Sequence, residues 1–375
     1  MSTALQHNRT AELTLTQLLD ANQGFALLAR GTTNHCPMAM IALSKMHASP
    51  ARLREYFAQW QEKYAIYSDT DVVAIKRENW QHSLGQVEDF PALHRCFGAW
   101  IAEQGVAKLL VEVLGQIPFA PASGAFHAAI RLAYGLEVGH HGEIAAALAA
   151  LVTGHLALPL PQMKDEKELM TAEAALAVLS QQMAGRHYGG PWITTQLRAV
   201  ALDPDFVRYL PQVTLATTNS GELITELATL AIRLYWQTKN FTSLHMVTGL
   251  HAARIVCEHL QREFPAELLT HLLPNLMAPL WSAFAAAYVA LGAPALAPLP
   301  QIEPDALALD WPALLARAVQ SNNDHTIKMS YSCWQEAQHY LPQRQRQPQQ
   351  QQPRQPDEIC AADLYLAAVR RMLPV

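Results

Sequence analysis

The sequence predicts an all-α protein, a multi-helix globular bundle in a chain of 375 residues. Apolar residues recur at three- and four-residue spacing along most of the chain, whereas strand-like alternation is nearly absent. Half of the residues are hydrophobic and only 16% are charged, so the chain can bury one large core. We therefore expect one helical domain over residues 1–375. Residues 159–167, where prolines meet a run of charges, are the best candidate for a sub-domain boundary.

Helix-start signals place the elements of the N-terminal half. Asn34 is a plausible N-cap with Pro37 in the first turn, and Ser49-Pro50 opens a further helix whose polar face, including Arg52, we expect at the surface. Gly105 divides one long apolar stretch into two helices, and 79–85 reads as a loop or a single turn. The expected helices are 14–22, those starting at Asn34 and Ser49, 90–103, 106–115, 125–137 and 143–156.

The C-terminal half continues the helical pattern with longer elements. Residues 294–304 hold four prolines and read as an extended connector. Residues 342–356 are rich in Gln, Pro and Arg, a composition that cannot bury apolar area, so we expect a flexible segment there. The expected helices are 172–183, 203–209, 222–235, 243–260, 266–291, 311–319, one that runs from His325 to Tyr340, and 361–372.

Composition excludes several classes of function. The net charge is -5 and no basic run interleaves with aromatic residues, so we expect no nucleic-acid partner. Five scattered cysteines without a CxxC pair indicate reduced thiols, hence a cytoplasmic protein. The most apolar stretch, 276–297, is interrupted by prolines and favours a buried helix over a membrane span. The oligomeric state is left open.

The common catalytic signatures are missing from the sequence. It has no GxGxxG after a strand, no GxxxxGK[ST] and no GxSxG, so no dinucleotide site, P-loop or nucleophile elbow is supported. It also lacks HExxH and the carboxylate–histidine pairs of ferritin-like bundles.

Four of the 16 histidines differ from the rest because each falls at or near the start of an apolar helix. They are His35, His127, His245 and His325. One such residue is usually a satisfied core histidine, but four on four helices can form a metal site, because bundles build such sites from inward-pointing side chains. Neutral imidazoles suit iron, zinc and copper.

Two ambiguities remain at this level. His251 lies six residues after His245, about 120° around the helix, so one central site can readily use only one of the two. Each ligand imidazole also needs an acceptor for its second nitrogen. The candidates for that role are Asn34, Glu137, Thr248 and Asp324, and plausible pocket walls are Trp80, Tyr134 and Met246.

His325 and Lys328 are three residues apart and project from one helix face. A buried lysine near a cation is pushed toward its neutral form. A neutral amine can take up carbon dioxide and become a carbamate, which is a carboxylate-like metal ligand. The alternative is a capping histidine and a lysine that extends to solvent.

The histidine segments can be read together with Asn79-Trp80-Gln81-His82-Ser83-Leu84-Gly85. The most specific motifs are Phe126-His127 followed by Tyr134-Gly135-Leu136-Glu137, Leu244-His245-Met246-Val247-Thr248, and Asp324-His325-Thr326-Ile327-Lys328. In this order the set resembles the questin oxidase-like family, from about Asn34 to Tyr340.

The resemblance implies an all-helical oxidoreductase, an oxygenase that cleaves or oxygenates an aromatic, anthraquinone-like or polyketide-like substrate with dioxygen. It implies non-haem Fe(II) held by four histidines and a carboxylated lysine. Matched by motif, these are His35, His127, His245, His325 and Lys328. The family context favours His245 over His251.

Two alternatives stay open. Some members of the family are described as NADPH-dependent Baeyer–Villiger oxygenases, so a metal-independent enzyme that uses NADPH is one alternative. A non-catalytic helical ligand-binding protein is the other. For the iron-dependent oxygenase and for the NADPH-dependent enzyme, the expected partners are a small aromatic substrate and dioxygen.

Overall fold

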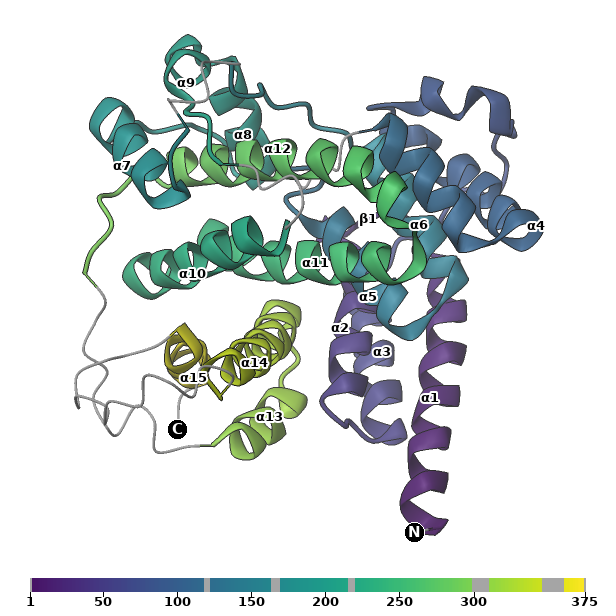
Figure 1. Cartoon of the computed structure of the whole chain (residues 1–375). Coiled ribbons are helices and arrows are strands. Elements are labelled where there is room, and N and C mark those ends of the chain that lie inside the picture. The colour runs from purple at the N-terminus through teal and green to yellow at the C-terminus, as the bar shows by residue number, and fades with distance from the viewer. Residues whose placement is uncertain are drawn as a thin grey trace.

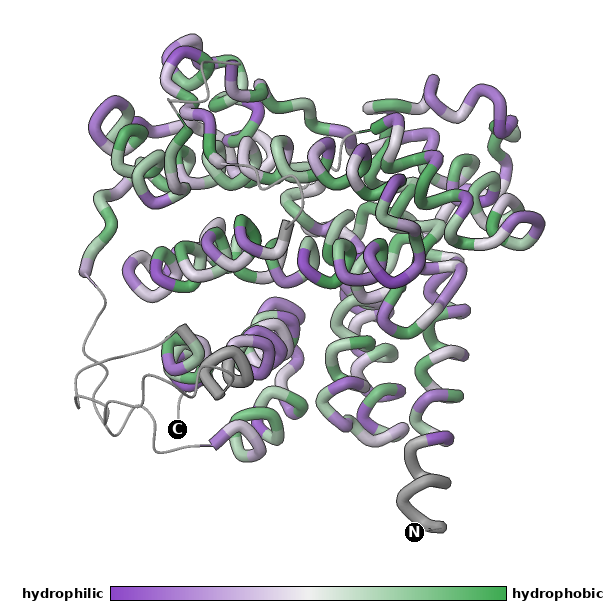
Figure 2. Tube along the Cα trace, in the orientation of Figure 1, coloured by the Kyte–Doolittle hydropathy of each residue, from purple (hydrophilic) through white to green (hydrophobic). Residues whose placement is uncertain are grey.

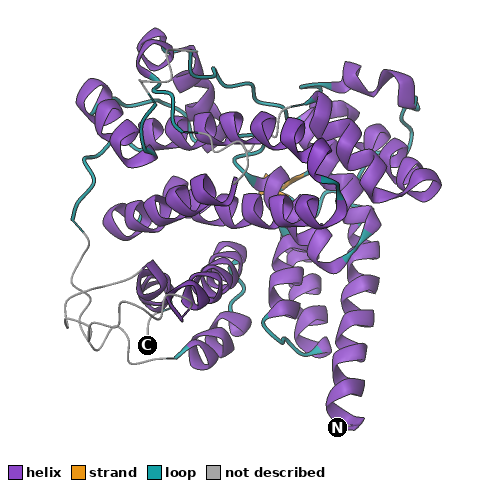
Figure 3. Cartoon of the chain, viewed as in Figure 1, coloured by secondary structure: helices purple, strands orange, loops and turns teal. Residues whose placement is uncertain are grey.

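Helices form nearly all of the fold, as predicted (Figures 1 and 3). The computed structural model describes residues 2–117, 122–162, 169–214, 220–298, 310–345 and 361–373. Hydrophobic and hydrophilic residues are interspersed along almost every helix, which is the pattern expected where one face is buried (Figure 2).

The N-terminal half begins with α1 (Ser2–Asn22) and the two-residue strands β1 (Leu28–Ala29) and β2 (Thr32–Thr33), which pair antiparallel. This hairpin directly precedes His35 and α2. The helices that follow are α2 (Cys36–Lys45), α3 (Pro50–Tyr64), the 3-10 helices η1 (Arg77–Ser83) and η2 (Val87–Asp89), α4 (Phe90–Gln116), α5 (His127–Val138) and α6 (His141–Thr153).

The C-terminal half contains three further long helices among shorter ones. In order, the described helices are α7 (Ala172–Met183), α8 (Ile193–Leu202), α9 (Pro204–Tyr209), α10 (Ser220–Thr238), α11 (Phe241–Glu263), α12 (Ala266–Ala290), α13 (Trp311–Gln320), α14 (Asp324–Gln345) and α15 (Ala361–Met372). The three long ones are α11, α12 and α14. α11 lies in the middle of the molecule and packs against α5, α10, α12 and α14 (Figure 1).

Most predicted boundaries agree with the structure within a few residues. Gly105 has a left-handed φ of 82° inside α4, so the chain does kink where the sequence predicts a division. Two details differ. α14 continues to Gln345, five residues beyond the predicted end at Tyr340 and into the segment expected to be flexible. Most of the proposed boundary segment, residues 163–168, lies outside the described residues, as do 299–309 in the connector and 346–360 in the Gln-rich segment.

The prediction for Arg52 is wrong. Its side chain is buried, and it donates hydrogen bonds to the carbonyl oxygens of Val319 and Ser321 and to the side-chain oxygen of Asn322. A guanidinium has five donors in a fixed fork, so it can hold a turn by its carbonyl oxygens. Arg52 thereby fixes the turn that leads into α14.

Among the described helices, α12 alone is long and apolar enough to cross a membrane by length and composition. Of its most apolar window, 78% is buried inside the protein. A buried core helix meets the same two criteria, and this was the sequence-based expectation for the stretch.

Candidate metal centre

Four packed helices begin at one point of the core. His35 directly precedes α2, His127 is the first residue of α5, His245 lies one turn into α11, and His325 is the second residue of α14. α2 packs against α5, α5 against α11, α11 against α14, and α14 against α2, so the four helices form a closed ring. Segments that are far apart in sequence therefore bring their imidazoles together because the helix starts coincide.

A strained turn positions His127. Gly124, Ala125 and Phe126 all have left-handed φ values, of 59°, 56° and 71°. Such values cost about 1–3 kcal/mol for each residue other than glycine and persist only where packing holds them. Phe126 is held against Gly249 of α11, where an added Cβ would lie 2.6 Å from the phenyl ring. The turn places the Gly124 carbonyl oxygen 2.6 Å from Nδ1 of His127.

Each of the four imidazoles has an acceptor at Nδ1. The carboxylate of Asp324 serves two of them, because its two oxygens accept from Nδ1 of His35 at 2.6 Å and Nδ1 of His325 at 2.7 Å. Hydrogen bonds to both rings hold the pKa of Asp324 well below its usual range, although burial alone would raise it. Asp324 is thus an ionised bridge that fixes two rings.

The other two imidazoles donate to backbone carbonyl oxygens. Nδ1 of His127 donates to Gly124, and Nδ1 of His245 donates to Phe241 at 2.8 Å. Since a carbonyl oxygen can only accept, the proton of each neutral ring sits on Nδ1 and the lone pair on Nε2. All four rings therefore present Nε2 as a potential metal ligand.

The Nε2 atoms converge. His35, His127 and His325 can each bring one ring nitrogen within 4.8 Å of the other two. Nε2 of His245 lies 3.2 Å from Nε2 of His127. Two lone pairs that face each other at this distance repel unless a cation lies between them. Metal–nitrogen bonds of about 2.0–2.1 Å place neighbouring ligand nitrogens about 3 Å apart, which matches this separation.

The surroundings keep these rings neutral. Burial, reinforced by the nearby Lys328 amine, lowers the pKa of His35 to about 3. Burial also lowers the pKa values of His127 and His245 well below the ordinary value, and that of His325 to a smaller degree. Neutral imidazole is the form that binds metals.

Lys328 lies close to the imidazoles, in the second turn of α14. It is 1% exposed, and its Nζ has no hydrogen-bond partner among the described residues. Burial lowers the pKa of this amine to about 8, against the opposing effect of Asp324. Burying a lysine amine without a hydrogen-bond partner costs folding free energy unless a bound group interacts with it. Nε2 of His35 and of His325 are likewise buried without a partner in the described part of the chain.

Phe241 stands at the solvent side of the cluster. Its ring lies 4.5 Å from that of His245 and 4.6 Å from that of His325, between centroids. Its side chain is nevertheless 52% exposed, which is unusual for a large apolar residue at the start of a core helix. Phe241 therefore separates the histidine centre from solvent.

The other residues that the sequence suggested as acceptors for the imidazoles or as pocket walls make their hydrogen bonds and packing contacts with different groups. Asn34 accepts from the backbone N–H of Cys36 and donates to Asn22, and Thr248 donates to backbone carbonyls of its own helix. Glu137 accepts from Tyr331. Trp80, Tyr134 and Met246 are fully buried core residues. Tyr134 pairs with Ser332, and Trp80 packs on Phe97.

The structure brings His245, rather than His251, to the cluster. His251 bonds to Glu336 instead, at 2.8 Å. Sequence reasoning missed the two carbonyl acceptors, because every residue carries a carbonyl and its direction depends on the fold. It also missed Phe241, for which aromatic character directly after Asn240 is the one local signal.

Comparison with known proteins identifies the family of this chain. No curated protein matches the chain significantly. A sequence model of the questin oxidase-like family matches residues 32–333, which include His35, His127, His245, His325 and Lys328. The match covers most of the chain. It includes α2, α5 and α11 in full and α14 as far as Cys333. The chain therefore belongs to the questin oxidase-like family, a family of oxidoreductases.

Proposed function

We propose that this protein is an iron-dependent oxygenase that acts with dioxygen on an aromatic, polyketide-like substrate. Family membership implies an oxygenase for substrates of this kind. The observation that carries the iron site is that four imidazoles each have Nδ1 hydrogen-bonded, while Nε2 of His245 faces Nε2 of His127 and ring nitrogens of His35, His127 and His325 lie within 4.8 Å of one another.

The donor set fits a divalent transition metal. Four neutral nitrogens and one amine are present, and imidazole suits iron, copper, nickel and zinc. The residues that would hold the ion are His35, His127, His245, His325 and Lys328. Bound iron would supply the ability to activate dioxygen, whose direct reaction with a closed-shell aromatic molecule is otherwise slow.

Lys328 would contribute as a carbamate. The neutral amine forms an N–C bond to carbon dioxide and releases one proton, which converts a neutral nitrogen into an anionic oxygen ligand. The lowered pKa makes the neutral amine accessible near neutral pH. Four helix N-termini meet here, and their partial positive charge favours a bound anion over an ammonium.

The phenyl ring of Phe241 and the oxygens that accept from the imidazoles would position the substrate and the ligands. Asp324, Gly124 and Phe241 hold the imidazoles in one tautomer, so the ligands need no reorganisation when a metal binds. The exposed phenyl ring of Phe241 offers a flat apolar surface at the mouth of the site, on which a substrate ring can stack.

Elemental analysis of the protein purified without added metal tests the proposal. We expect close to one iron per chain, and we expect His127→Ala and His325→Ala to lose it while helix content by circular dichroism is retained. His271, exposed on α12, is the matched control, and His271→Ala should keep its metal.

Iron loading should also produce dioxygen uptake with a dihydroxyanthraquinone. Carbon-13 NMR after incubation with labelled bicarbonate should show a carbamate carbon that is missing from Lys328→Met. A full complement of metal in both histidine variants would refute the site. Dioxygen uptake that needs NADPH and no metal would instead favour a Baeyer–Villiger oxygenase.

A further inference from the structure

A second buried imidazole lies on the helix that supplies His245. His251 is completely buried in α11, and Nδ1 of its ring is 2.8 Å from Oε1 of Glu336 on α14. Glu336 is 1% exposed. The same carboxylate oxygen accepts from Nε of Arg254 at 2.8 Å and lies 2.6 Å from Nη2. The three side chains form a charge-balanced group away from the metal centre.

The contacts define the tautomer of His251. Arg254 neutralises Glu336, and although burial opposes ionisation, the hydrogen bond from His251 and the charge of Arg254 lower the pKa of Glu336 to about 2. An imidazole nitrogen at 2.8 Å from a carboxylate oxygen donates to it. Nη2 of Arg254 is also 3.3 Å from Nδ1, because both groups converge on one oxygen. In the neutral ring the lone pair therefore sits on Nε2.

Nε2 of His251 is buried and has no hydrogen-bond partner among the described residues. An acceptor left in this state is costly unless a donor reaches it. Oε2 of Glu137 is in the same condition, while its Oε1 accepts from Tyr331 at 2.7 Å. Oε2 of Glu336 is also buried without a described partner, and all three groups are acceptors, so the missing group is a hydrogen-bond donor.

His251 and Glu137 line one cavity of about 620 Å³. Helices α2, α5, α11 and α14 all contribute to its wall. The wall also carries three cationic side chains, Lys45, Arg254 and Arg262, a second carboxylate, Glu258, which pairs with Arg254, and the apolar side chains of Leu136 and Ile255. With three cations against two carboxylates, Glu137 and Glu258, the wall favours a donor that becomes partly anionic as it shares its proton.

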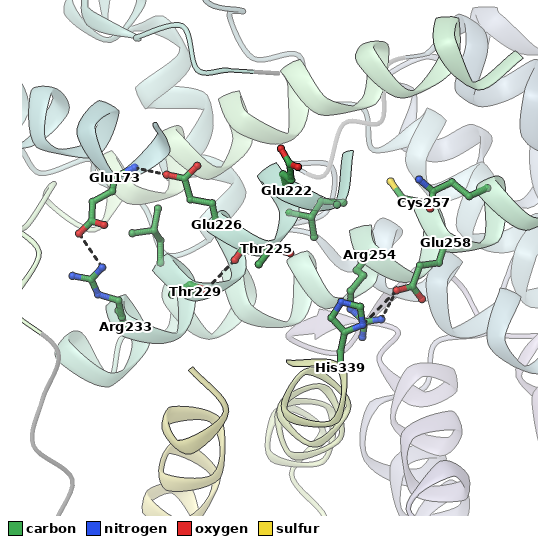
Figure 4. Close-up of a pocket in the computed structure, with 14 residues that line it drawn as sticks. Glu173, Glu222, Thr225, Glu226, Thr229, Arg233, Arg254, Cys257, Glu258 and His339 are labelled. Carbon is green, nitrogen blue, oxygen red and sulfur yellow. Dashed lines mark hydrogen bonds and ion pairs between the residues drawn. The ribbon is translucent and has the colours of Figure 1, made fainter. Parts of the chain in front are cut away.

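This cavity is separate from the metal centre. His251 lies six residues beyond His245, which is about 9 Å along the helix. Tyr134 and Ser332 are fully buried and hydrogen-bonded to each other, and they lie on α5 and α14, two of the helices that line this cavity. On the other side, Arg254 and Glu258 also line a neighbouring cavity of about 700 Å³ over α10, and His339 stands next to them (Figure 4). The Arg254–Glu258 ion pair, at 2.9 Å, thus lies between two cavities.

We propose that the cavity at His251 is a second binding site, for a phenol or a similarly acidic hydroxyl compound, whose O–H donates to Nε2 of His251. The apolar residues would contact its ring, and the cationic side chains would stabilise the oxygen as it gains negative charge. The proposal does not depend on a metal or on oxygenase activity, so it can fail or hold independently of the proposed function.

Binding of 4-nitrophenol and of its methyl ether 4-nitroanisole to the full chain tests this site. The two molecules have similar shape, but only the phenol can donate. We expect saturable binding of 4-nitrophenol in the presence of a metal chelator, and binding of 4-nitroanisole that is weaker by roughly tenfold or more, as for one lost hydrogen bond to a buried acceptor. Nitrogen-15 NMR should show the Nε2 signal of His251 shifting toward the protonated position.

Variants locate the binding. His251→Gln should weaken 4-nitrophenol binding by roughly tenfold, as for the loss of one hydrogen bond. His259→Gln, on the same helix but outside the lining of this cavity, should leave the binding unchanged. Equal affinity for the two probes, equal affinity of His251→Gln and the unmodified protein, or no saturable binding would each overturn the proposal. If His251→Gln does not fold, the comparison of the two probes on the unmodified chain decides.

Discussion

α11 and α14 each contribute to two histidine sites, and the sites satisfy their imidazoles in different ways. At the helix starts, His245 and His325 turn Nε2 toward other imidazoles, with Asp324 as the anion beside them. Farther along the same helices, His251 donates to Glu336, which Arg254 neutralises. The second group balances its own charge.

The first group does not complete itself in the same way. Its Nε2 lone pairs face one another or have no described partner, and Nζ of Lys328 has no described acceptor. The difference shows how two clusters of buried histidines can be distinguished. A cluster that lacks an internal cation between its lone pairs fits a metal, whereas a cluster with a paired arginine balances its own charge and leaves only acceptors, Nε2 of His251 and Oε2 of Glu336, without a described partner.

Lowering the pH should distinguish the histidine centre from the group of His251, Glu336 and Arg254 most strongly, through its effect on the free energy of unfolding. In the metal-free fold the pKa of His35 is lowered to about 3, so the unfolded chain, with an ordinary value near 6.5, takes up protons first. Stability should therefore fall as the pH drops from 6.5 toward 3. Glu336 has a depressed pKa of about 2, so its contribution is present above 4.5 and is lost as the pH falls from 4.5 to 2.

Urea denaturation of the chelator-treated protein at a series of pH values measures this. We expect the free energy of unfolding to decline already between about pH 6.5 and 5, where the histidine centre titrates together with other buried histidines such as His94, whereas Glu336 does not. His35→Asn should reduce that slope, and Glu336→Gln should alter the curve only in the more acidic range. A flat curve above pH 5 would contradict the assignment of neutral imidazoles.

Arg254→Leu should cause the next largest effect, in the charge-balanced group. It leaves Glu336 buried beside His251 without its cation, and breaking a buried pair by removing one partner costs about 3–5 kcal/mol. Metal content should stay as in the unmodified protein, because none of the proposed ligands contacts Arg254. Arg233→Leu, on the more exposed pair with Glu173, is the matched control and should cost at most about 1 kcal/mol.

Much of this arrangement was predictable from the sequence. The four histidines at helix starts and the His325–Lys328 spacing point to a shared site because helix periodicity fixes which side chains project together. The choice between His245 and His251 came from family resemblance, and in the structure it is the 3.2 Å contact to His127 that distinguishes them.

The rest depended on tertiary contacts. His251 and Arg254 are three residues apart on one helix, but Glu336 lies more than 80 residues away, and no local pattern links it to them. The left-handed turn before His127 contains Ala125 and Phe126, which rarely adopt positive φ, so only the packing of Phe126 on Gly249 accounts for it. Arg52 was placed on a polar helix face, whereas its partners belong to a turn far along the chain.

Asp324→Asn should have an intermediate effect, confined to the metal centre. One carboxylate fixes both His35 and His325, and an amide can accept from only one of them through its single oxygen. Loss of the hydrogen-bond acceptor of a ligand imidazole typically costs about 10–100-fold in metal affinity. Competition with a chelator measures it. Asp310→Asn, at the N-cap of α13, is the control, and its metal affinity should be unchanged.

Phe241→Ala should change stability least. The side chain is half exposed, so its removal should alter the free energy of unfolding by about 1 kcal/mol or less. Its backbone carbonyl, which fixes His245, remains in place. The ring, however, lies against two of the proposed ligands, so its loss should open the centre to water and speed iron release to a chelator several-fold. Trp192→Ala, at another exposed aromatic residue, should leave the release rate unaltered. If the two variants released iron equally fast, Phe241 would be an ordinary surface residue and the centre would open to solvent elsewhere.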